Sequence, residues 1–283
     1  MTKPIELGKL KLHVLSDGGL RLDGGAMFGV VPRAVWEKTN PPDERNRVAL
    51  GLNPVLVETP GELVLIDTGV GDKGDEKFND IYGIERPGTL AGSLGDAGFA
   101  PKDVTIVINT HLHFDHAGGN TGLTPAGKLA PVYPGARYVV QAGELSAAQS
   151  PNERTRASYR PEDFMPLKEA RVLETIDGDG EVTPGVSVFR TGGHNRDIQL
   201  VRITSEGRTA VFLTDLIPTA THLSYPFIAG YDLFPLEVLE AKKAVIEGAA
   251  EDRWLLLFYH DPLVRAGYVS IEGGKPRLEP AGG

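Results

Sequence analysis

Three histidines and one aspartate lie within six residues of this chain, and this cluster constrains the fold more than any other feature of the sequence. The four side chains are His111, His113, Asp115 and His116. They follow residues 104–108, an apolar and β-branched stretch with the length of a buried strand. On an extended backbone His111 and His113 point the same way, because side chains repeat every second residue. The Gly-Gly pair at 118–119 favours a turn, which would let Asp115 and His116 reach a neighbouring point.

Three further side chains of the same types stand at or just beyond the ends of other apolar stretches. His194 follows residues 186–189, Asp215 follows residues 210–213, and His260 follows residues 254–259. The ends of several strands can converge on one rim of a sheet, where loops give access to a substrate. Burying this many polar groups without a cation would be costly. Because the chain has no Cys, the donors must be His and carboxylates, which suit zinc, with manganese, iron or cobalt as substitutes.

The rest of the chain is predicted to mix strands and helices in one domain over residues 1–283. Residues 54–57 and 63–66 predict a β-hairpin around the turn at 60–61, and residues 10–14 predict a strand with one apolar face. Helices are predicted over 89–97, with Gly98 as the C-cap, and over 236–246. Residues 144–167 contain three Pro and are interpreted as a helix followed by an exposed insertion. Further strands are predicted at 104–108, 138–140, 186–189, 198–203, 210–213 and 254–259.

Composition narrows the range of partners. The formal net charge is -9 at pH 7, and the sequence contains no run of Lys and Arg. Both observations argue against nucleic acid as a binding partner. No stretch approaches the roughly 20 apolar residues of a membrane span, and the N-terminus lacks the apolar core of a signal peptide. We therefore expect a cytoplasmic protein that acts on a small molecule and binds neither nucleic acid nor a membrane.

Taken together, the seven side chains resemble the ligand set of the metallo-β-lactamase superfamily. Its His-x-His-x-Asp-His signature is matched by His111, His113, Asp115 and His116, and its later His, Asp and His by His194, Asp215 and His260. The stretch Ile66-Asp67-Thr68-Gly69 resembles the family's strand-end Asp, which supports the ligand loop from behind. The resemblance covers essentially the whole chain. It implies an α+β fold, the αββα sandwich of two mixed β-sheets with helices on the outer faces.

The resemblance also implies a role for each ligand. His111, His113 and His194 would hold a first metal ion, Asp115, His116 and His260 a second, and Asp215 would bridge the two. We therefore expect a hydrolase with two divalent metal ions, zinc in the first place, whose shared hydroxide attacks a substrate carbonyl. Asp115 would act both as a ligand and as a proton carrier.

Within the superfamily, residues 110–120 (THLHFDHAGGN) are similar to the quorum-quenching N-acyl-homoserine lactonases. Residues 27–32 and 215–219, with His222 after them, look more like the lactonase-like branch that includes methyl parathion hydrolase. The sequence departs from the lactonases at two places: their Tyr three residues after the bridging Asp is Pro218 here, and their Gly-His-Thr around the third His is Gly193-His194-Asn195. We expect His222 to replace that Tyr as a donor to the oxyanion, the alternative being a surface or supporting position.

The predicted substrate is a lactone of the N-acyl-homoserine lactone kind or a related ester. A phosphotriester hydrolase is the nearest alternative, since the same hydroxide can attack phosphorus. A non-catalytic metal-binding or redox protein is the alternative from another class. An apolar acyl pocket is predicted from Phe28, Val30, Val31 and Trp36, although core packing or a dimer contact would account for these residues equally well. A homodimer is the expectation that the family gives.

Overall fold

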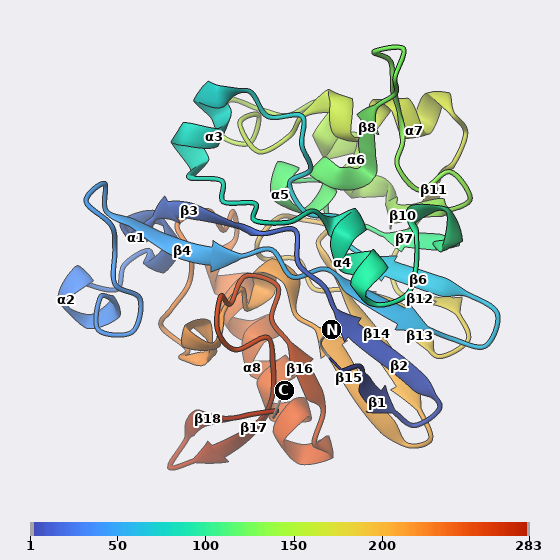
Figure 1. The fold of residues 1–283 in the computed structure, drawn as a ribbon. Helices are drawn as coiled ribbons and strands as arrows, with labels where there is room; N and C mark the ends of the chain where they lie inside the picture. Colours follow the sequence, from blue (N-terminus) through green and yellow to red (C-terminus); the bar gives the residue numbers. More distant parts are fainter. Residues whose placement is uncertain (1–2, 282–283) are drawn as a thin grey trace.

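Two seven-stranded β-sheets lie face to face in the computed structural model, which describes residues 3–281 (Figure 1). The first sheet has the strand order β1 (Ile5–Leu7), β2 (Leu10–Val14), β5 (Val55–Glu58), β6 (Leu63–Ile66), β7 (Ile106–Ile108), β10 (Arg137–Gln141) and β11 (Leu173–Ile176). The second sheet has the order β12 (Gly180–Thr183), β13 (Val186–Arg190), β14 (Gln199–Ser205), β15 (Arg208–Phe212), β16 (Leu255–Leu257), β17 (Ala266–Glu272) and β18 (Lys275–Pro280). Both sheets are mixed, because β6, β7, β10 and β11 are parallel neighbours in the first and β15 and β16 in the second.

The core between the sheets follows the two-residue alternation of the strands. In β6, Val64 and Ile66 belong to the cluster between the sheets, while Leu65 belongs to a cluster on the outer face. In β16, Leu256 likewise packs outward, between two residues that pack inward. Because strands such as β6 are buried on both faces, they appear in the sequence as continuous apolar runs rather than as alternating ones.

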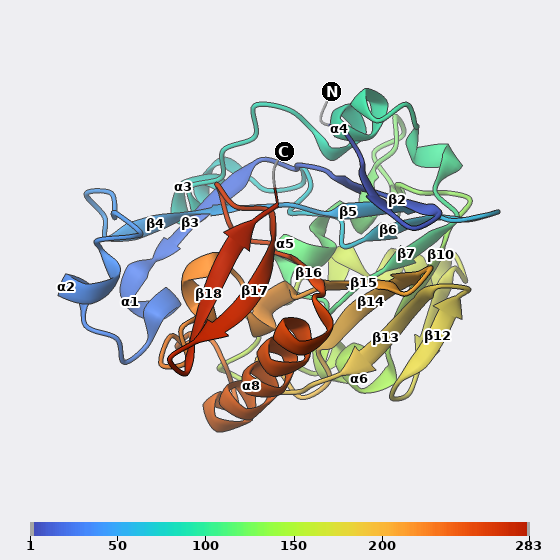
Figure 2. The ribbon, with the colours of Figure 1, turned by 90° about the horizontal axis from the view of Figure 1, so that it is seen from below.

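Helices cover the two outer faces, so that the layers run helix, sheet, sheet, helix (Figure 2). On the first sheet, α4 (Leu90–Asp96) packs Leu94 into the outer cluster with Leu65. On the second sheet, α8 (Pro235–Asp252) packs Ile246 into the outer cluster with Leu256. Figure 2 shows α4 and α8 on opposite sides of the paired sheets. This arrangement confirms the predicted αββα sandwich.

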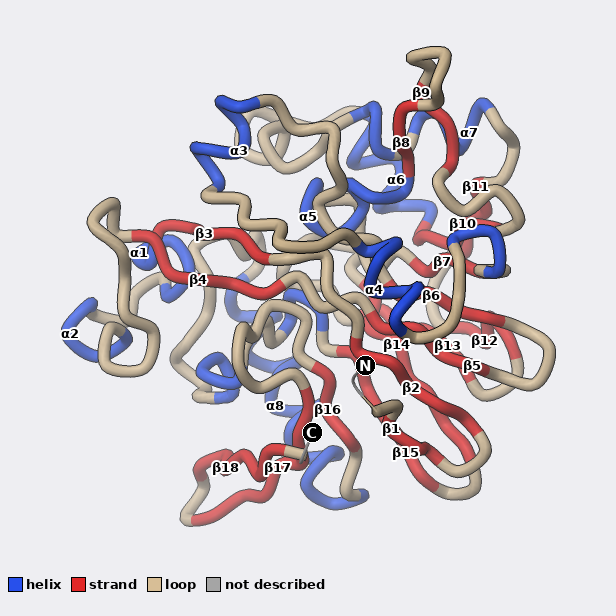
Figure 3. The backbone as a smooth tube through the Cα atoms, in the orientation of Figure 1, coloured by secondary structure: helices blue, strands red, loops and turns tan. Residues whose placement is uncertain are grey.

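Shorter elements and loops join these layers, as the tube in Figure 3 shows. Two small hairpins are formed by β3 (Gly19–Asp23) with β4 (Arg47–Gly51) and by β8 (Thr121–Leu123) with β9 (Leu129–Pro131). The remaining helices are α1 (Gly24–Phe28), α2 (Arg33–Trp36), α3 (Glu76–Tyr82), α5 (Phe114–Ala117), α6 (Ala142–Gln149) and α7 (Met165–Glu169). Short 3-10 turns are η1 (Pro101–Asp103), η2 (Gly118–Asn120), η3 (Pro161–Asp163), η4 (Thr214–Leu216) and η5 (Ala220–Leu223). Across residues 3–281, no helix combines the length and the apolarity needed to cross a membrane.

The predicted hairpin and both predicted helices are confirmed, although one helix is longer than expected. The β5 and β6 strands pair antiparallel, and α4 begins after Thr89, whose side chain accepts a hydrogen bond from the backbone of Gly92. Helix α8 continues past 246 to Asp252. It contains Gly248, although glycine is a weak helix former. Glycine fits here because the ring of Trp254 packs onto this position, where a Cβ atom would lie 2.8 Å from the ring.

The prediction of an exposed insertion within 144–167 is wrong in part. Helix α6 occupies the start of the segment, as expected, but Tyr159 and Phe164 are buried beside it and residues 165–169 form α7. The backbone of Ser158 also accepts a hydrogen bond of 2.8 Å from the backbone of Phe114 in the histidine-rich loop. These contacts could not be predicted from the sequence, because the apolar residues of the segment do not recur with the spacing of a helix or a strand.

Candidate metal centre

The seven predicted ligands lie on loops that follow the carboxyl ends of strands, at one edge of the sandwich. The cluster at 111–116 follows β7, His194 follows β13, Asp215 lies in η4 after β15, and His260 follows β16. The pairings show that β13, β15 and β16 run in the same direction as one another in the second sheet. In the first sheet, β6 and β7 are parallel to each other. Carboxyl ends of strands that run in the same direction share an edge, which is where open sheets bind ligands.

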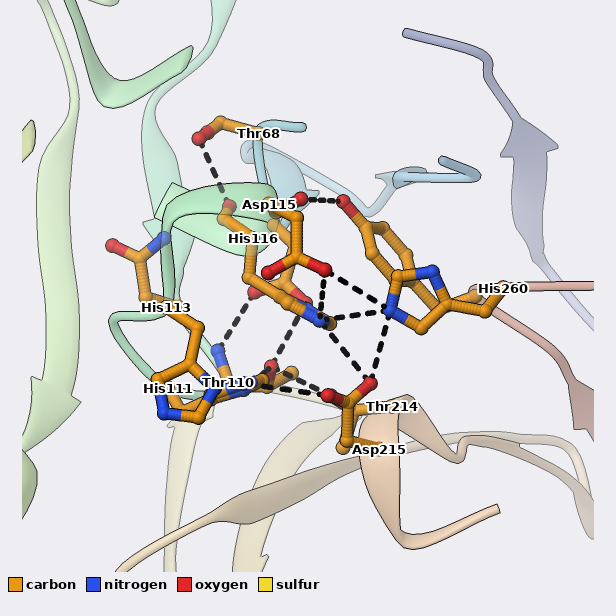
Figure 4. A network of polar contacts seen from close by, with 12 residues as sticks. Thr68, Thr110, His111, His113, Asp115, His116, Thr214, Asp215 and His260 are labelled. Carbon is orange, nitrogen blue, oxygen red and sulfur yellow. Dashed lines mark hydrogen bonds and ion pairs between the residues drawn. The ribbon is translucent and has the colours of Figure 1, made fainter. Parts of the chain in front are cut away.

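The structure brings all seven side chains together in two groups. The first group is His111, His113, His194 and Asp215, and the second is Asp115, His116 and His260; within each group one donor atom per residue lies within 4.8 Å of the others. Figure 4 shows the histidine-rich loop with Asp215 and His260 around a common centre. This is the grouping that the resemblance implied for two metal ions.

Asp215 lies between the two groups and offers one carboxylate oxygen to each. Its Oδ2 atom is 3.2 Å from Nε2 of His194 and 3.7 Å from Nε2 of His111. Its Oδ1 atom is 3.2 Å from Nε2 of His116 and also 3.2 Å from Nε2 of His260. The carboxylate therefore has the place of a bridging ligand.

The tautomers of the imidazoles indicate that cations belong between these donors. Nδ1 of His260 lies 2.9 Å from the carbonyl oxygen of Gly51, which can only accept, so Nδ1 carries the proton and Nε2 of the neutral ring presents a lone pair. The same holds for His116 and His194, whose Nδ1 atoms lie 2.8 Å from carboxylate oxygens of Asp67 and Asp232. Yet Nε2 of His116 and Nε2 of His260 lie only 3.2 Å apart. Two lone pairs at that distance repel each other unless a cation or an added proton lies between them.

Two buried donor atoms of the site also lack hydrogen-bond partners. They are Nε2 of His111 and Oδ1 of Asp215, and both are aimed at the other ligands. Buried polar atoms without partners are rare because desolvation costs free energy, and a role in binding an ion is one ordinary reason for them. The imidazole and carboxylate donors, without thiolates, fit zinc and its neighbours in the first transition series. The residues present therefore fit a pair of divalent cations.

Asp67 supports the second group from behind, as the family resemblance of residues 66–69 implied. Its carboxylate accepts hydrogen bonds from the backbone nitrogen and the hydroxyl of Thr110, each at 2.8 Å, and contacts Nδ1 of His116. The backbone of Asp67 is left-handed, with a φ of 56°, a conformation that costs a non-glycine residue of the order of 1 kcal/mol. The fully buried carboxylate holds the ligand loop in the orientation that points its imidazoles inward.

Asp232 is a supporting residue that the sequence did not indicate. Its Oδ1 atom lies 2.8 Å from Nδ1 of His194, and its Oδ2 atom accepts a hydrogen bond of 3.0 Å from the backbone of Ala229. It belongs to the loop between η5 and α8 and is 5% exposed. A single Asp in a polar loop carries no pattern that distinguishes it from a surface residue, so only the fold could reveal it.

Burial and neighbouring charges shift the pKa values of the side chains in this site in opposite directions. Burial opposes the charged form of His116, but the carboxylates of Asp215, Asp115 and Asp67 outweigh it and raise the pKa of this imidazole well above its usual value. Burial and the neighbouring imidazoles lower the pKa of His111 well below the usual value. For Asp215, the surrounding imidazoles outweigh burial and lower its pKa, so the bridging carboxylate stays ionised. The neutral imidazole of His111 and the ionised carboxylate of Asp215 are the forms that bind a metal ion, whereas His116 would give up a proton when a cation binds.

The structure gives His222 a different place from the predicted one. Its Nδ1 atom lies 2.7 Å from the hydroxyl of Thr219, and its Nε2 atom lies 2.9 Å from the carbonyl oxygen of Met27. Its ring stacks on Phe28, with the centroids 5.0 Å apart, and is 1% exposed. With both nitrogens engaged and the ring outside the cavity lining, His222 has no free donor for an oxyanion. It has instead the supporting position that was its alternative, and it holds the loop after Asp215.

A cavity of about 380 Å³ opens beside the ligands. Its apolar wall is formed by Leu22, Ala26, Met27, Leu50, Phe114, Pro218 and Leu233, and its other lining residues include Tyr82, Tyr231, Arg154, Thr155 and Ser158. The predicted acyl-pocket residues are not among them. Phe28 and Trp36 are buried in the core with their rings stacked 5.2 Å apart, and Val30 is 91% exposed. The two aromatic residues therefore serve core packing.

Comparison with known proteins places this site in a family. The metallo-beta-lactamase superfamily model matches residues 48–260. The N-acyl homoserine lactonase AiiA of Bacillus thuringiensis subsp. kurstaki is 30% identical over 219 residues, which are 73% of this chain and 79% of that protein.

Solved structures agree with this assignment. A probable metal-dependent hydrolase from Staphylococcus aureus superposes with a TM-score of 0.90 at 30% identity, over 98% of this chain and 99% of that one. AidC, a dizinc quorum-quenching lactonase in complex with a product, has a TM-score of 0.80 at 22% identity, over 99% of this chain and 97% of its own, a likeness that shows the fold.

Proposed function

Because this chain belongs to the metallo-beta-lactamase superfamily, we propose that it opens lactones of the N-acyl-homoserine lactone kind, or closely related carboxylic esters, with two divalent cations bound. It is a metal-dependent hydrolase, like the relatives it matches. The cations are proposed to be zinc, which suits a site of five imidazoles and two carboxylates without thiolates. The lactone preference is supported by the matches to N-acyl homoserine lactonases across most of the chain.

The observation that carries the proposal is the division of donors around Asp215. One of its carboxylate oxygens faces His111 and His194, and the other faces His116 and His260. A mononuclear site would need only one of these sets. We therefore propose that His111, His113 and His194 hold one cation, that Asp115, His116 and His260 hold the other, and that Asp215 bridges them.

When bound, two divalent cations acidify a coordinated water molecule and polarise a carbonyl oxygen. The chain's own contribution is to orient the donors, to exclude bulk water and to carry a proton. Asp115 lines the cavity, and its Oδ2 atom lies 3.5 Å from Nε2 of His260. The other carboxylate oxygen of Asp115, Oδ1, takes no part in the contact with His260. We propose that this oxygen accepts the proton of the attacking water and passes it to the leaving alkoxide.

The cavity is proposed to take the acyl portion of the substrate along its apolar wall. Leu22, Met27 and Phe114 lie on the same lining as Asp115 and His260. An acyl chain on this wall would place its carbonyl near the ligands, and removal of the chain from water would contribute about 0.8 kcal/mol for each methylene group.

The test combines metal analysis with a substrate panel. Purified protein should contain two equivalents of a divalent metal and should hydrolyse lactones faster than a phosphotriester or a β-lactam. An Asp115→Asn variant that folds and keeps both metals should lose hydrolysis, and full activity in that variant would remove the proton-carrier role. Preferential hydrolysis of the phosphotriester would replace the proposed substrate class, and protein without bound metal would refute the proposal as a whole.

A further inference from the structure

One positively charged side chain lines the cavity and takes no part in the chemistry proposed above. Among the lining residues that the structure describes, Arg154 is the only Lys or Arg. Its Nη2 atom donates a hydrogen bond of 2.8 Å to the carbonyl oxygen of Gly230, another lining residue. Within residues 3–281, no carboxylate oxygen lies within 4.0 Å of its guanidinium nitrogens. No described residue therefore pairs the charge of Arg154.

The turn that carries Arg154 is fixed on both sides. Oδ1 of Asn152 accepts hydrogen bonds from the backbone nitrogens of Arg154 and Thr155, at 2.9 and 3.1 Å. Further along, the carbonyl oxygen of Ser158 accepts from the backbone nitrogen of Phe114, the residue before Asp115. The backbone that carries Arg154 is thus held in a defined place relative to the candidate ligands, and the bond to Gly230 directs the guanidinium along the cavity lining.

The chemistry of the guanidinium indicates what it would bind. Arg presents five N–H donors in a planar fork that matches the two oxygens of a carboxylate, and the bond to Gly230 uses only one of them. The surrounding wall includes Leu22, Met27 and Leu233. Arg154 is exposed to solvent although it lines the cavity, so the paired charge-assisted hydrogen bonds of the fork, rather than exclusion of water, would hold a carboxylate there.

We propose that Arg154 is a specificity-determining residue, which binds a carboxylate that the substrate carries away from its scissile carbonyl. This inference rests on the proposed ester or lactone hydrolysis and narrows its substrate class to acyl groups that end in an acid. The apolar wall takes the intervening methylene groups, the metal ligands take the scissile carbonyl, and Arg154 takes the far carboxylate.

Two esters with the same leaving group and acyl chains of equal length separate this role from others. They are 4-nitrophenyl hexanoate and the 4-nitrophenyl monoester of adipic acid, which differ only in the terminal carboxylate. The metal-loaded protein should have the higher kcat/KM on the adipate ester. Arg154→Gln should lower kcat/KM about 2- to 5-fold on the adipate ester, the value of a solvent-exposed charge pair, and leave the hexanoate ester unchanged. Arg154→Lys should keep part of the preference, since it keeps the charge without the fork.

Arg156→Gln is the matched control, because this neighbouring arginine is exposed like Arg154 but does not line the cavity. It should leave both rates unchanged. An equal loss on both esters in Arg154→Gln would show that Arg154 only latches Gly230 and would overturn the inference, as would no loss on either. If the metal-loaded wild type hydrolyses neither ester nor a lactone, the proposed function fails. Calorimetric binding of monomethyl adipate then still tests Arg154: weaker binding to Arg154→Gln alone supports it, and equal binding to all variants overturns it.

Discussion

Acid should destabilise this protein in part through His222, and the surroundings of that side chain set the size of the effect. Burial lowers the pKa of His222 from its usual 6.5 to about 4. Both ring nitrogens are already held, by Thr219 and by the carbonyl oxygen of Met27, and the ring stacks on Phe28. On unfolding, the imidazole regains its ordinary pKa. Between pH 6.5 and 4 the unfolded chain therefore binds more protons than the folded one, and stability is lost as the pH falls.

The magnitude follows from the two pKa values. Between pH 7.5 and 5.5, protonation of the unfolded imidazole should cost about 1.3 kcal/mol of unfolding free energy, with pKa values of 6.5 unfolded and about 4 folded. No discount for solvent is needed, because the side chain is 1% exposed.

The assay is urea unfolding of the wild type and of His222→Phe at both pH values, with metal at matched concentrations. The variant loses two hydrogen bonds and is expected to be less stable at either pH, but this offset cancels in the comparison across pH. Loss of metal on acidification is common to both proteins and cancels as well. The wild type should therefore lose about 1.3 kcal/mol more than the variant between pH 7.5 and 5.5. Equal losses in the two proteins would refute the reasoning.

Two further substitutions test the supports of the site. Asp232→Asn keeps the size of the side chain but removes the charge behind His194, so we expect metal affinity to fall about 10- to 100-fold in competition with a chelator; unchanged affinity would contradict the role of Asp232. Lys73 is 3.1 Å from the buried carboxylate of Asp163 and donates to the carbonyl oxygens of Gly118 and Thr121. Lys73→Met should lower the unfolding free energy by about 3 kcal/mol because it removes the nearer of the two cationic side chains beside that carboxylate and leaves only Arg160, at 4.0 Å. Adding Asp163→Asn should recover part of the loss, and no recovery would show that the charge is not the cause.

The seven side chains of the candidate metal centre could be selected from the sequence because their signal is dense. Four of them lie within six residues. His194, Asp215 and His260 each follow a strand, and the strands before Asp215 and His260 end in continuous apolar runs that are buried on both faces. Such runs are visible without a structure, and so are the turns that end them. The αββα sandwich can be predicted when the resemblance of the ligand motif to a family is added to these runs.

Other parts of the molecule were beyond reach of the sequence for identifiable physical reasons. The hairpin of β17 and β18 has a largely exposed outer half, so its alternation of apolar and charged residues is short and gives only a weak signal. Asp232 and Lys73 act through contacts with residues far away in the chain, which no local pattern encodes. The prediction for His222 was wrong because proximity to Asp215 in sequence does not fix a side chain's direction. Its ring turns toward Phe28, where stacking and two hydrogen bonds hold it.

The two halves of the metal site are supported unequally, and this should appear when metal is removed. In the second group, His116 is held by Asp67 at the end of β6, and His260 is held by the carbonyl oxygen of Gly51 in β4. Both supports belong to or directly follow strands. In the first group, His194 is held by Asp232, which lies in a loop and also binds the backbone of that loop at Ala229.

Local opening is easiest where backbone is not part of a sheet, so the first group should lose its cation before the second. Stepwise chelation should therefore yield a species with one equivalent of metal, held by Asp115, His116 and His260 together with Asp215. In Asp232→Asn this species should form at lower chelator concentration, while removal of the last equivalent should be unchanged. Simultaneous loss of both equivalents in both proteins would show that the bridging carboxylate couples the two halves too tightly for their different supports to matter.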